Sequence, residues 1–210
     1  MAASRYRTVD RLTLADDIHS CKRCPLSEQQ GGHSPVAPYV GKRYGRKGIA
    51  VICDFPRFYD LKAGQPLKGK DGVLFDRLAK AAGMERGMFF ITDSVRCKPP
   101  NNRIDDYPEA INACGQWTQD EFALYDPAVV VLMGRVALRQ VFGAEATVAA
   151  TRGSLAATPA KHPWGQRLLV ATYHPAAATF GGGEQSEVGQ FIAQDLRAAM
   201  TAWRALKAAA

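Results

Sequence analysis

The sequence predicts an α/β fold built on a parallel β-sheet. Short apolar runs that suit buried strands alternate along the chain with longer segments whose apolar residues recur at helical spacing. Strands that alternate with helices in this way pair in parallel, because each helix carries the chain back across the sheet. Four core strands are predicted, at residues 48–53, 88–94, 128–133 and 168–172.

The predicted helices lie between and after these strands. Gly83 is expected to end the first helix, since glycine adopts the left-handed conformation of a helix C-cap without strain. Pro127 marks the end of the second, because the residue before a proline disfavours the helical conformation. A short strand or hairpin is expected around residues 152–156. Helices are expected at residues 71–82, 105–124, 135–142 and 187–208.

Three polar motifs follow directly on predicted strands. They begin at Asp54, Asp93 and His174. In an open α/β sheet, ligands bind beyond the carboxyl ends of the strands. We therefore expect these motifs to form the functional site.

The composition is that of a globular protein. The chain has 210 residues, of which 47% are hydrophobic and 22% charged, and this length suits a single domain over residues 1–210. No apolar run approaches the ~18 residues of a membrane span. The basic residues at the start are not followed by the apolar stretch of a signal peptide. We expect a cytoplasmic monomer with no membrane partner.

Positive charge indicates a polyanionic partner. The formal net charge is +7, and lysines and arginines release counterions when they bind nucleic acid. Residues 42–47 hold four cations and one aromatic residue. DNA contacts are expected at Lys68, Lys70, Arg96, Lys98 and Arg103.

Four of the five cysteines form a candidate metal site. Cys21 and Cys24 are a C-x-x-C pair, and Cys97 and Cys114 follow as widely spaced single residues. Four thiolates can enclose zinc or hold an iron–sulfur cluster, and the cysteines alone leave both open. Cys53 lies inside an apolar run and is expected to be a small buried side chain. A disulfide framework is not expected in the cytoplasm.

Four motifs in order along the chain carry a family resemblance. Residues 21–26 read C-x-x-C-P-L, and an acidic, proline-containing loop at residues 53–57 leads to a second one at 64–72. Residues 92–100 read T-D-S-V-R-C-K-P-P, and residues 173–178 read Y-H-P-A-A-A. Together these motifs resemble the iron–sulfur branch of the uracil-DNA glycosylase superfamily.

The resemblance implies a three-layer α/β/α sandwich around a parallel four-stranded sheet. Enzymes of this kind flip a base out of DNA and hydrolyse the bond between the base and its sugar. The resemblance also implies a structural four-iron, four-sulfur (4Fe–4S) cluster on Cys21, Cys24, Cys97 and Cys114. Segments 21–24 and 97–114 would then form a clip, with zinc as the less favoured occupant.

Two residues at family positions suit catalysis. Asp54 stands where the family has a glutamate, and a carboxylate there can hold or activate water or stabilise a cationic sugar. The alternative for Asp54 is a loop-capping aspartate. His174 precedes a proline at the position of the family histidine, which stabilises the anion forming at O2 of the leaving base. The alternative for His174 is a structural role.

The aromatic residue that stacks on the base is replaced. Leu67 stands where the family has phenylalanine. Stacking is worth about 1–3 kcal/mol per base, so Phe55, Phe58 or Tyr59 is expected to contact the base, unless these side chains are core contacts. Phe180, in the loop after His174, is expected to act as a wedge in the DNA.

Asp93 replaces the asparagine that reads uracil in the family. An ionised carboxylate only accepts hydrogen bonds, so it repels uracil O4 but accepts from the N4 amine of cytosine. Its second oxygen prefers to be protonated against cytosine N3, and burial favours protonation. We therefore predict a glycosylase for cytosine or 5-substituted cytosine, acting in defence against phage with modified DNA. The alternatives are a uracil-DNA glycosylase of base-excision repair, a non-catalytic DNA-binding iron–sulfur module, and a redox sensor.

Overall fold

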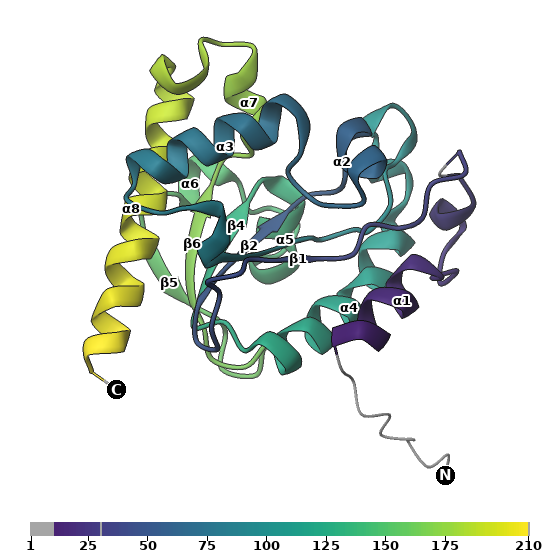
Figure 1. The fold of residues 1–210 in the computed structure, drawn as a ribbon, viewed down its shortest axis with the longest axis horizontal. Coiled ribbons are helices and arrows are strands. Elements are labelled where there is room, and N and C mark those ends of the chain that lie inside the picture. The colour runs from purple at the N-terminus through teal and green to yellow at the C-terminus, as the bar shows by residue number, and fades with distance from the viewer. Residues whose placement is uncertain (1–10, 30, 210) are drawn as a thin grey trace.

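A computed structural model describes residues 11–29 and 31–209 of the chain. Within these ranges, six strands form one sheet in the order β1-β3-β2-β4-β6-β5. The four central strands are parallel, which confirms the prediction (Figure 1). These strands are β2 Ile49–Cys53, β3 Phe89–Asp93, β4 Val129–Met133 and β6 Leu168–Thr172.

Two edge strands make the sheet larger than the four strands predicted. β1 Tyr39–Val40 pairs antiparallel with β3, and β5 Leu155–Ala157 pairs antiparallel with β6. Neither strand contains a fully buried residue. They therefore lack the continuous apolar run by which the central strands could be found.

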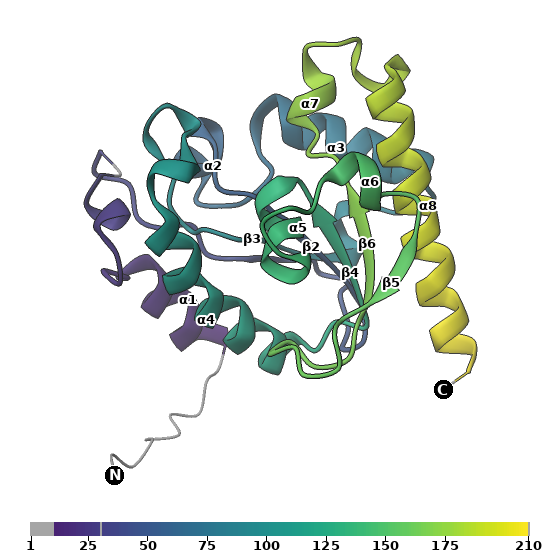
Figure 2. The same cartoon turned by 180° about the vertical axis from the view of Figure 1, so that it is seen from behind.

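Helices cover both faces of the sheet (Figures 1 and 2). One face carries α1 Arg11–His19, α4 Pro108–Tyr125 and α5 Arg135–Phe142. The other face carries α3 Gly69–Ala81, α7 Ala176–Thr179 and α8 Glu187–Ala208. The side chains of β2 alternate between the two cores, with Ile52 in the first and Val51 in the second. This is the three-layer α/β/α sandwich that the resemblance implied.

The long helix α4 begins at Pro108 rather than at residue 105. Residues Ile104–Asp106 form a separate 3₁₀ turn, and proline suits the first helical position because it lacks the N–H that would be unpaired there. The helices α5 and α8 have the predicted bounds. The short helices are α2 Phe58–Ala63 and α6 Val148–Thr151, and the other 3₁₀ turns are Pro25–Gln29, Arg86–Met88, Pro100–Asn102 and Gly183–Gln185.

None of the helices in these described ranges is both long and apolar enough to cross a membrane.

The parallel register brings the carboxyl ends of the four central strands to one level. Cys53 at the end of β2 pairs with Asp93 of β3 and with Met133 of β4, and Met133 pairs with Thr172 of β6. The segments that follow these strands therefore leave the sheet along the same edge.

Candidate active site

The edge formed by the strand ends carries the three predicted motifs. Asp54 directly follows β2, Asp93 is the last residue of β3, and His174 lies two residues beyond the end of β6. The register of the sheet thus gathers side chains from three parts of the sequence. This arrangement matches the position at which open α/β sheets bind ligands.

Asp54 is held at the start of helix α5. Its Oδ1 accepts hydrogen bonds from the backbone N–H groups of Val136 at 2.7 Å and Ala137 at 3.2 Å. Burial raises the pKa of Asp54 to about 6, although these hydrogen bonds and the charge of Arg135 act in the opposite direction. Asp54 therefore has a capping role, but it caps the start of helix α5 rather than a loop. A carboxyl with this pKa is ionised at neutral pH, so capping does not prevent it from serving in catalysis.

Gly134 leaves the space that Asp54 occupies. Its φ of 115° suits glycine. A Cβ at this position would lie 2.5–2.6 Å from the carboxyl atoms of Asp54, closer than real contacts allow. The carboxyl of Asp54 therefore sits against the backbone at the junction of β4 and α5.

Asp93 is buried, with 3% of its surface exposed. In the part of the chain that the structure describes, its Oδ2 is buried and has no hydrogen-bond partner. Burial raises the pKa of Asp93 well above its usual value, and the charge of Asp60 adds to this effect while that of Arg96 opposes it. These surroundings favour a neutral carboxyl.

His174 is neutral, and its proton has a defined place. Its Nδ1 accepts a hydrogen bond from the backbone N–H of Ala176 at 3.1 Å. The proton of the neutral ring is therefore on Nε2, which can donate. Burial lowers the pKa of His174 to about 4, the charge of Asp71 acting to raise it and that of Arg57 to lower it.

Sequence reasoning did not identify the residues that surround His174. Asp71 forms an ion pair with Arg57 at 3.1 Å and accepts a hydrogen bond from the Thr179 hydroxyl at 2.8 Å. Asp71 lies in the first turn of α3, where an acidic residue is already favoured by the helix dipole. The sequence around Asp71 does not distinguish it from an ordinary acidic residue of a first helical turn, because its partner Thr179 is 108 positions away.

The residues expected to contact the base have different positions. Leu67 is 2% exposed and packs in the core on the α3 and α8 face, and its contact with a base stays a prediction. Phe55 is half-buried and packs against the opposite core. Phe58 and Tyr59 are 51% and 57% exposed, with their ring centroids 5.5 Å apart. These two rings remain candidates for contacts with DNA.

The expected DNA contacts also divide into buried and exposed residues. Arg96 is 1% exposed and forms an ion pair with Glu121 at 2.8 Å, so the prediction that it contacts phosphate is corrected. Arg103 is exposed and pairs with Asp106. Phe180 is 88% exposed. Lys70 is exposed, while Lys68 and Lys98 are half-buried.

The four predicted metal ligands lie near one another and all are free thiols. Burial raises the pKa of Cys97, and the charges of Cys114, Cys24 and Cys21 add to this effect in that order, which places the four sulfurs within electrostatic reach. The backbone N–H of Arg96 lies 3.5 Å from the Cys114 sulfur. Among residues 11–29 and 31–209, no set of three or more His, Cys, Asp or Glu side chains has the spacing of a bound metal ion.

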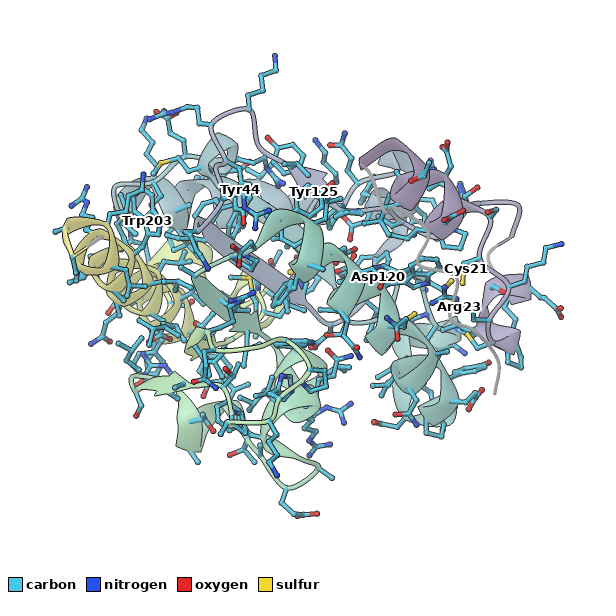
Figure 3. All side chains as sticks on the ribbon, turned by 90° about the horizontal axis from the view of Figure 1, so that it is seen from below. Cys21, Arg23, Tyr44, Asp120, Tyr125 and Trp203 are labelled. Atoms are coloured by element: carbon cyan, nitrogen blue, oxygen red, sulfur yellow. The ribbon has the colours of Figure 1, made fainter. Side chains whose placement is uncertain are left out.

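A stacked pair attaches the C-x-x-C segment to helix α4. The guanidinium carbon of Arg23 lies 3.5 Å from the centre of the Trp117 ring. Figure 3 shows Cys21 and Arg23 beside α4, at the end of the molecule opposite to Trp203 on α8. The four thiols are the donor type of a cluster held by cysteines, although the described side chains are not spaced as the ligands of a single metal ion.

A parallel α/β/α sandwich thus carries Asp54, Asp93 and His174 at its strand ends. The chain belongs to the uracil-DNA glycosylase superfamily, whose family model matches residues 45–197. Members of this superfamily are hydrolases that act on N-glycosyl bonds. The resemblance inferred from the motifs is thereby confirmed.

Curated relatives carry names from two types of this superfamily. The chain is 30% identical to the type-4 uracil-DNA glycosylase of Archaeoglobus fulgidus, over 80% of this chain and 82% of that protein. It is 28% identical to the type-4 enzyme of Sulfurisphaera tokodaii, over 80% and 74% of the two chains. A shorter match, 31% identical over 48% of this chain and 42% of the relative, is to the type-5 enzyme of Pyrobaculum aerophilum.

Proposed function

We propose that this protein is a DNA glycosylase that excises a cytosine-type base, with a 5-substituted cytosine as its target. The observation that carries the proposal is Asp93, which is buried, has an unpartnered Oδ2 and favours the neutral form. A neutral carboxyl offers one O–H donor and one C=O acceptor. Cytosine presents the complement, because its N3 accepts and its N4 amine donates.

Uracil is the second candidate, for a specific chemical reason. When the two oxygens of a neutral Asp93 exchange roles, its C=O accepts from uracil N3–H and its O–H donates to O4. The names of the relatives support this alternative. An ionised Asp93 accepts only and would repel uracil O4, so protonation of this residue decides whether uracil can be read at all.

The catalytic step assigns one role to each of the other two residues. The N-glycosidic bond breaks with its electron pair on the base, and Nε2–H of His174 donates to O2, where negative charge develops. The carboxylate of Asp54 stabilises the positive charge on the sugar and holds the attacking water. The water oxygen bonds to C1′ of the sugar, one of its protons passes through Asp54 to solvent, and the released base anion takes up a proton from solvent.

A structural 4Fe–4S cluster on the four cysteines is part of the proposal. The all-thiol donor set and the proximity of the four sulfurs support it, with zinc as the less favoured occupant. The cluster would cross-link residues 21–24 to the segment 97–114, which leads from Asp93 into helix α4. No part of the reaction involves it.

The biological setting follows from the target. Excision of ordinary cytosine would destroy the host genome, so a modified cytosine in invading phage DNA is the proposed substrate. We propose that the protein acts in this way as a monomer in the cytoplasm. If uracil proves to be the target, base-excision repair replaces phage defence as the role.

Identification of the released base tests the proposal. The protein is incubated with single- and double-stranded DNA carrying uracil, cytosine, 5-methylcytosine or 5-hydroxymethylcytosine, and the free base is identified by mass spectrometry. His174→Ala is the control for contaminating activity. Release of a cytosine-type base supports the proposal, and release of uracil alone refutes its cytosine part. DNA binding without release of any base would favour the non-catalytic module.

A further inference from the structure

We propose that a groove beside the active site binds an unpaired base of the substrate strand, next to the flipped nucleotide, by stacking it on Tyr59. This inference rests on the proposed action on DNA but assigns a second binding site. The groove is lined by residues from α2, from α3 between Gly69 and Arg77, and from the segment after His174. Its cavity of about 540 Å³ falls within the roughly 300–1,000 Å³ of small-ligand sites.

An exposed aromatic ring forms one wall of the groove. Tyr59 is 57% exposed, and the nearby Val73 is 53% exposed, so the groove presents apolar surface that the fold does not bury. The Tyr59 ring rests on the backbone of Gly69, where an added Cβ would lie 2.8 Å from a ring carbon. Phe58 packs edge-on against the same ring. The ring is thus supported from below and from one side, as a stacking platform requires.

The charge of the groove fits a nucleotide better than an apolar peptide. Lys70 and Arg77 line it, and the Arg77 guanidinium is held at 3.2 Å from Glu184. Lys68, the N-cap of α3, lies directly before the lined segment. Cations at the rim of an aromatic platform form the usual site for single-stranded nucleic acid, with phosphates on the cations and a base on the ring.

The groove borders the active site. Thr179 lines the groove and donates a hydrogen bond to Asp71, the residue whose charge acts on His174. Phe180, the predicted wedge, follows directly and is 88% exposed. A wedge that opens the stack at the flipped nucleotide also frees its neighbour, which can then enter a groove sharing a wall with the His174 loop.

Fluorescence of 2-aminopurine tests stacking at this site. The analogue is placed at each position flanking a pyrimidine that the protein does not release, in single-stranded and in duplex DNA. Binding of the full-length protein is followed by quenching of the analogue and by fluorescence anisotropy. At one flanking position, wild-type protein is expected to quench the fluorescence. Tyr59→Leu should abolish this quenching and weaken binding by about 5- to 150-fold, as expected for loss of one stacked base. The matched control is Leu155→Ala, which removes an apolar side chain of similar exposure from edge strand β5.

Two results would overturn the inference. One is quenching that survives in Tyr59→Leu, and the other is a wild-type protein that quenches no flanking position. Because the DNA carries no base that is excised, the measurement is independent of catalysis. Tyr59-dependent quenching without base release from any DNA would refute the proposed reaction but would still support base binding in the groove.

Discussion

Replacement of Arg96 by methionine tests the buried ion pair that displaced a predicted DNA contact. The side chains of Arg96 and Glu121 are 1% and 0% exposed, and their charged atoms are 2.8 Å apart. Arg96→Met leaves the Glu121 carboxylate buried without its partner, which typically costs about 3–5 kcal/mol. In a chain of this length, about 1 kcal/mol shifts the melting temperature by ~2–4 °C, so a fall of roughly 6–20 °C is expected.

An exposed ion pair provides the matched control. In the pair formed by Arg103 and Asp106, the side chains are 70% and 48% exposed, and such pairs contribute about 1 kcal/mol or less. Arg103→Met should therefore unfold close to the wild-type temperature. The double substitution Arg96→Met with Glu121→Leu should recover much of the loss, because it removes both charges from the interior.

The assay combines stability with binding. Urea unfolding followed by tryptophan fluorescence gives the free energy of unfolding, and anisotropy of labelled DNA gives the affinity of the folded fraction. We expect Arg96→Met to lose stability while its folded fraction keeps its DNA affinity. An Arg96→Met protein that is as stable as Arg103→Met and binds DNA more weakly would refute the reasoning and restore Arg96 as a phosphate contact.

Three further predictions concern the active site and the cysteines. At pH 8, Asp54→Asn should slow base release by about 10²- to 10³-fold, yet be at least as stable to urea as wild type, because an amide oxygen still accepts from α5. The direction of this stability change follows from the raised pKa of Asp54, about 6 in the folded protein. The stability that Asp54 contributes is present below the pKa of a free aspartate and is lost as pH rises through 6, so at pH 8 the asparagine variant does not bear the cost of a buried charge. A clearly less stable Asp54→Asn would contradict this. His174→Gln should retain more base release than His174→Ala, since its amide can donate. Asp54, with its pKa of about 6, should give the wild-type rate an inflection near pH 6. The lowered pKa of about 4 for His174 therefore predicts that the residual rate of Asp54→Asn has no inflection near pH 6.5, and one there would count against a neutral His174. Cys97→Ser should abolish visible absorption and lower the iron content, whereas a colourless wild-type protein containing zinc would exclude the iron–sulfur cluster.

The strands and helices that could be predicted are those with a strong local pattern. The central strands β2 and β4 are buried on both faces and form continuous apolar runs, so residues 48–53 and 128–133 stand out against their surroundings. Helix α8 has its predicted bounds because its apolar residues recur at helical spacing, and in the structure the Ser186 hydroxyl caps its start. The two residues of β1 carry no such signal. They are half-buried, and this edge strand is positioned by its pairing with β3.

The position of the candidate site could be predicted where it depends on strand ends and not where it depends on packing. Asp54 and Asp93 follow from position alone, since each lies where a buried strand stops. Arg96 was misplaced because its partner Glu121 lies 25 residues away, and sequence does not show which side of a loop turns inward. The preference of a basic side chain for solvent was overridden by that buried partner.

Gly134 limits how this enzyme can evolve. Asp54 occupies the volume that any side chain at position 134 would need, so every substitution there must displace the carboxyl that we propose acts on the sugar. Asp93 lies on a different strand, and a change there alters the reading of the base without filling that volume. If Asp93 reads the base as proposed, new base preferences are expected to arise by substitution at position 93, while Gly134 preserves the position of the Asp54 carboxyl.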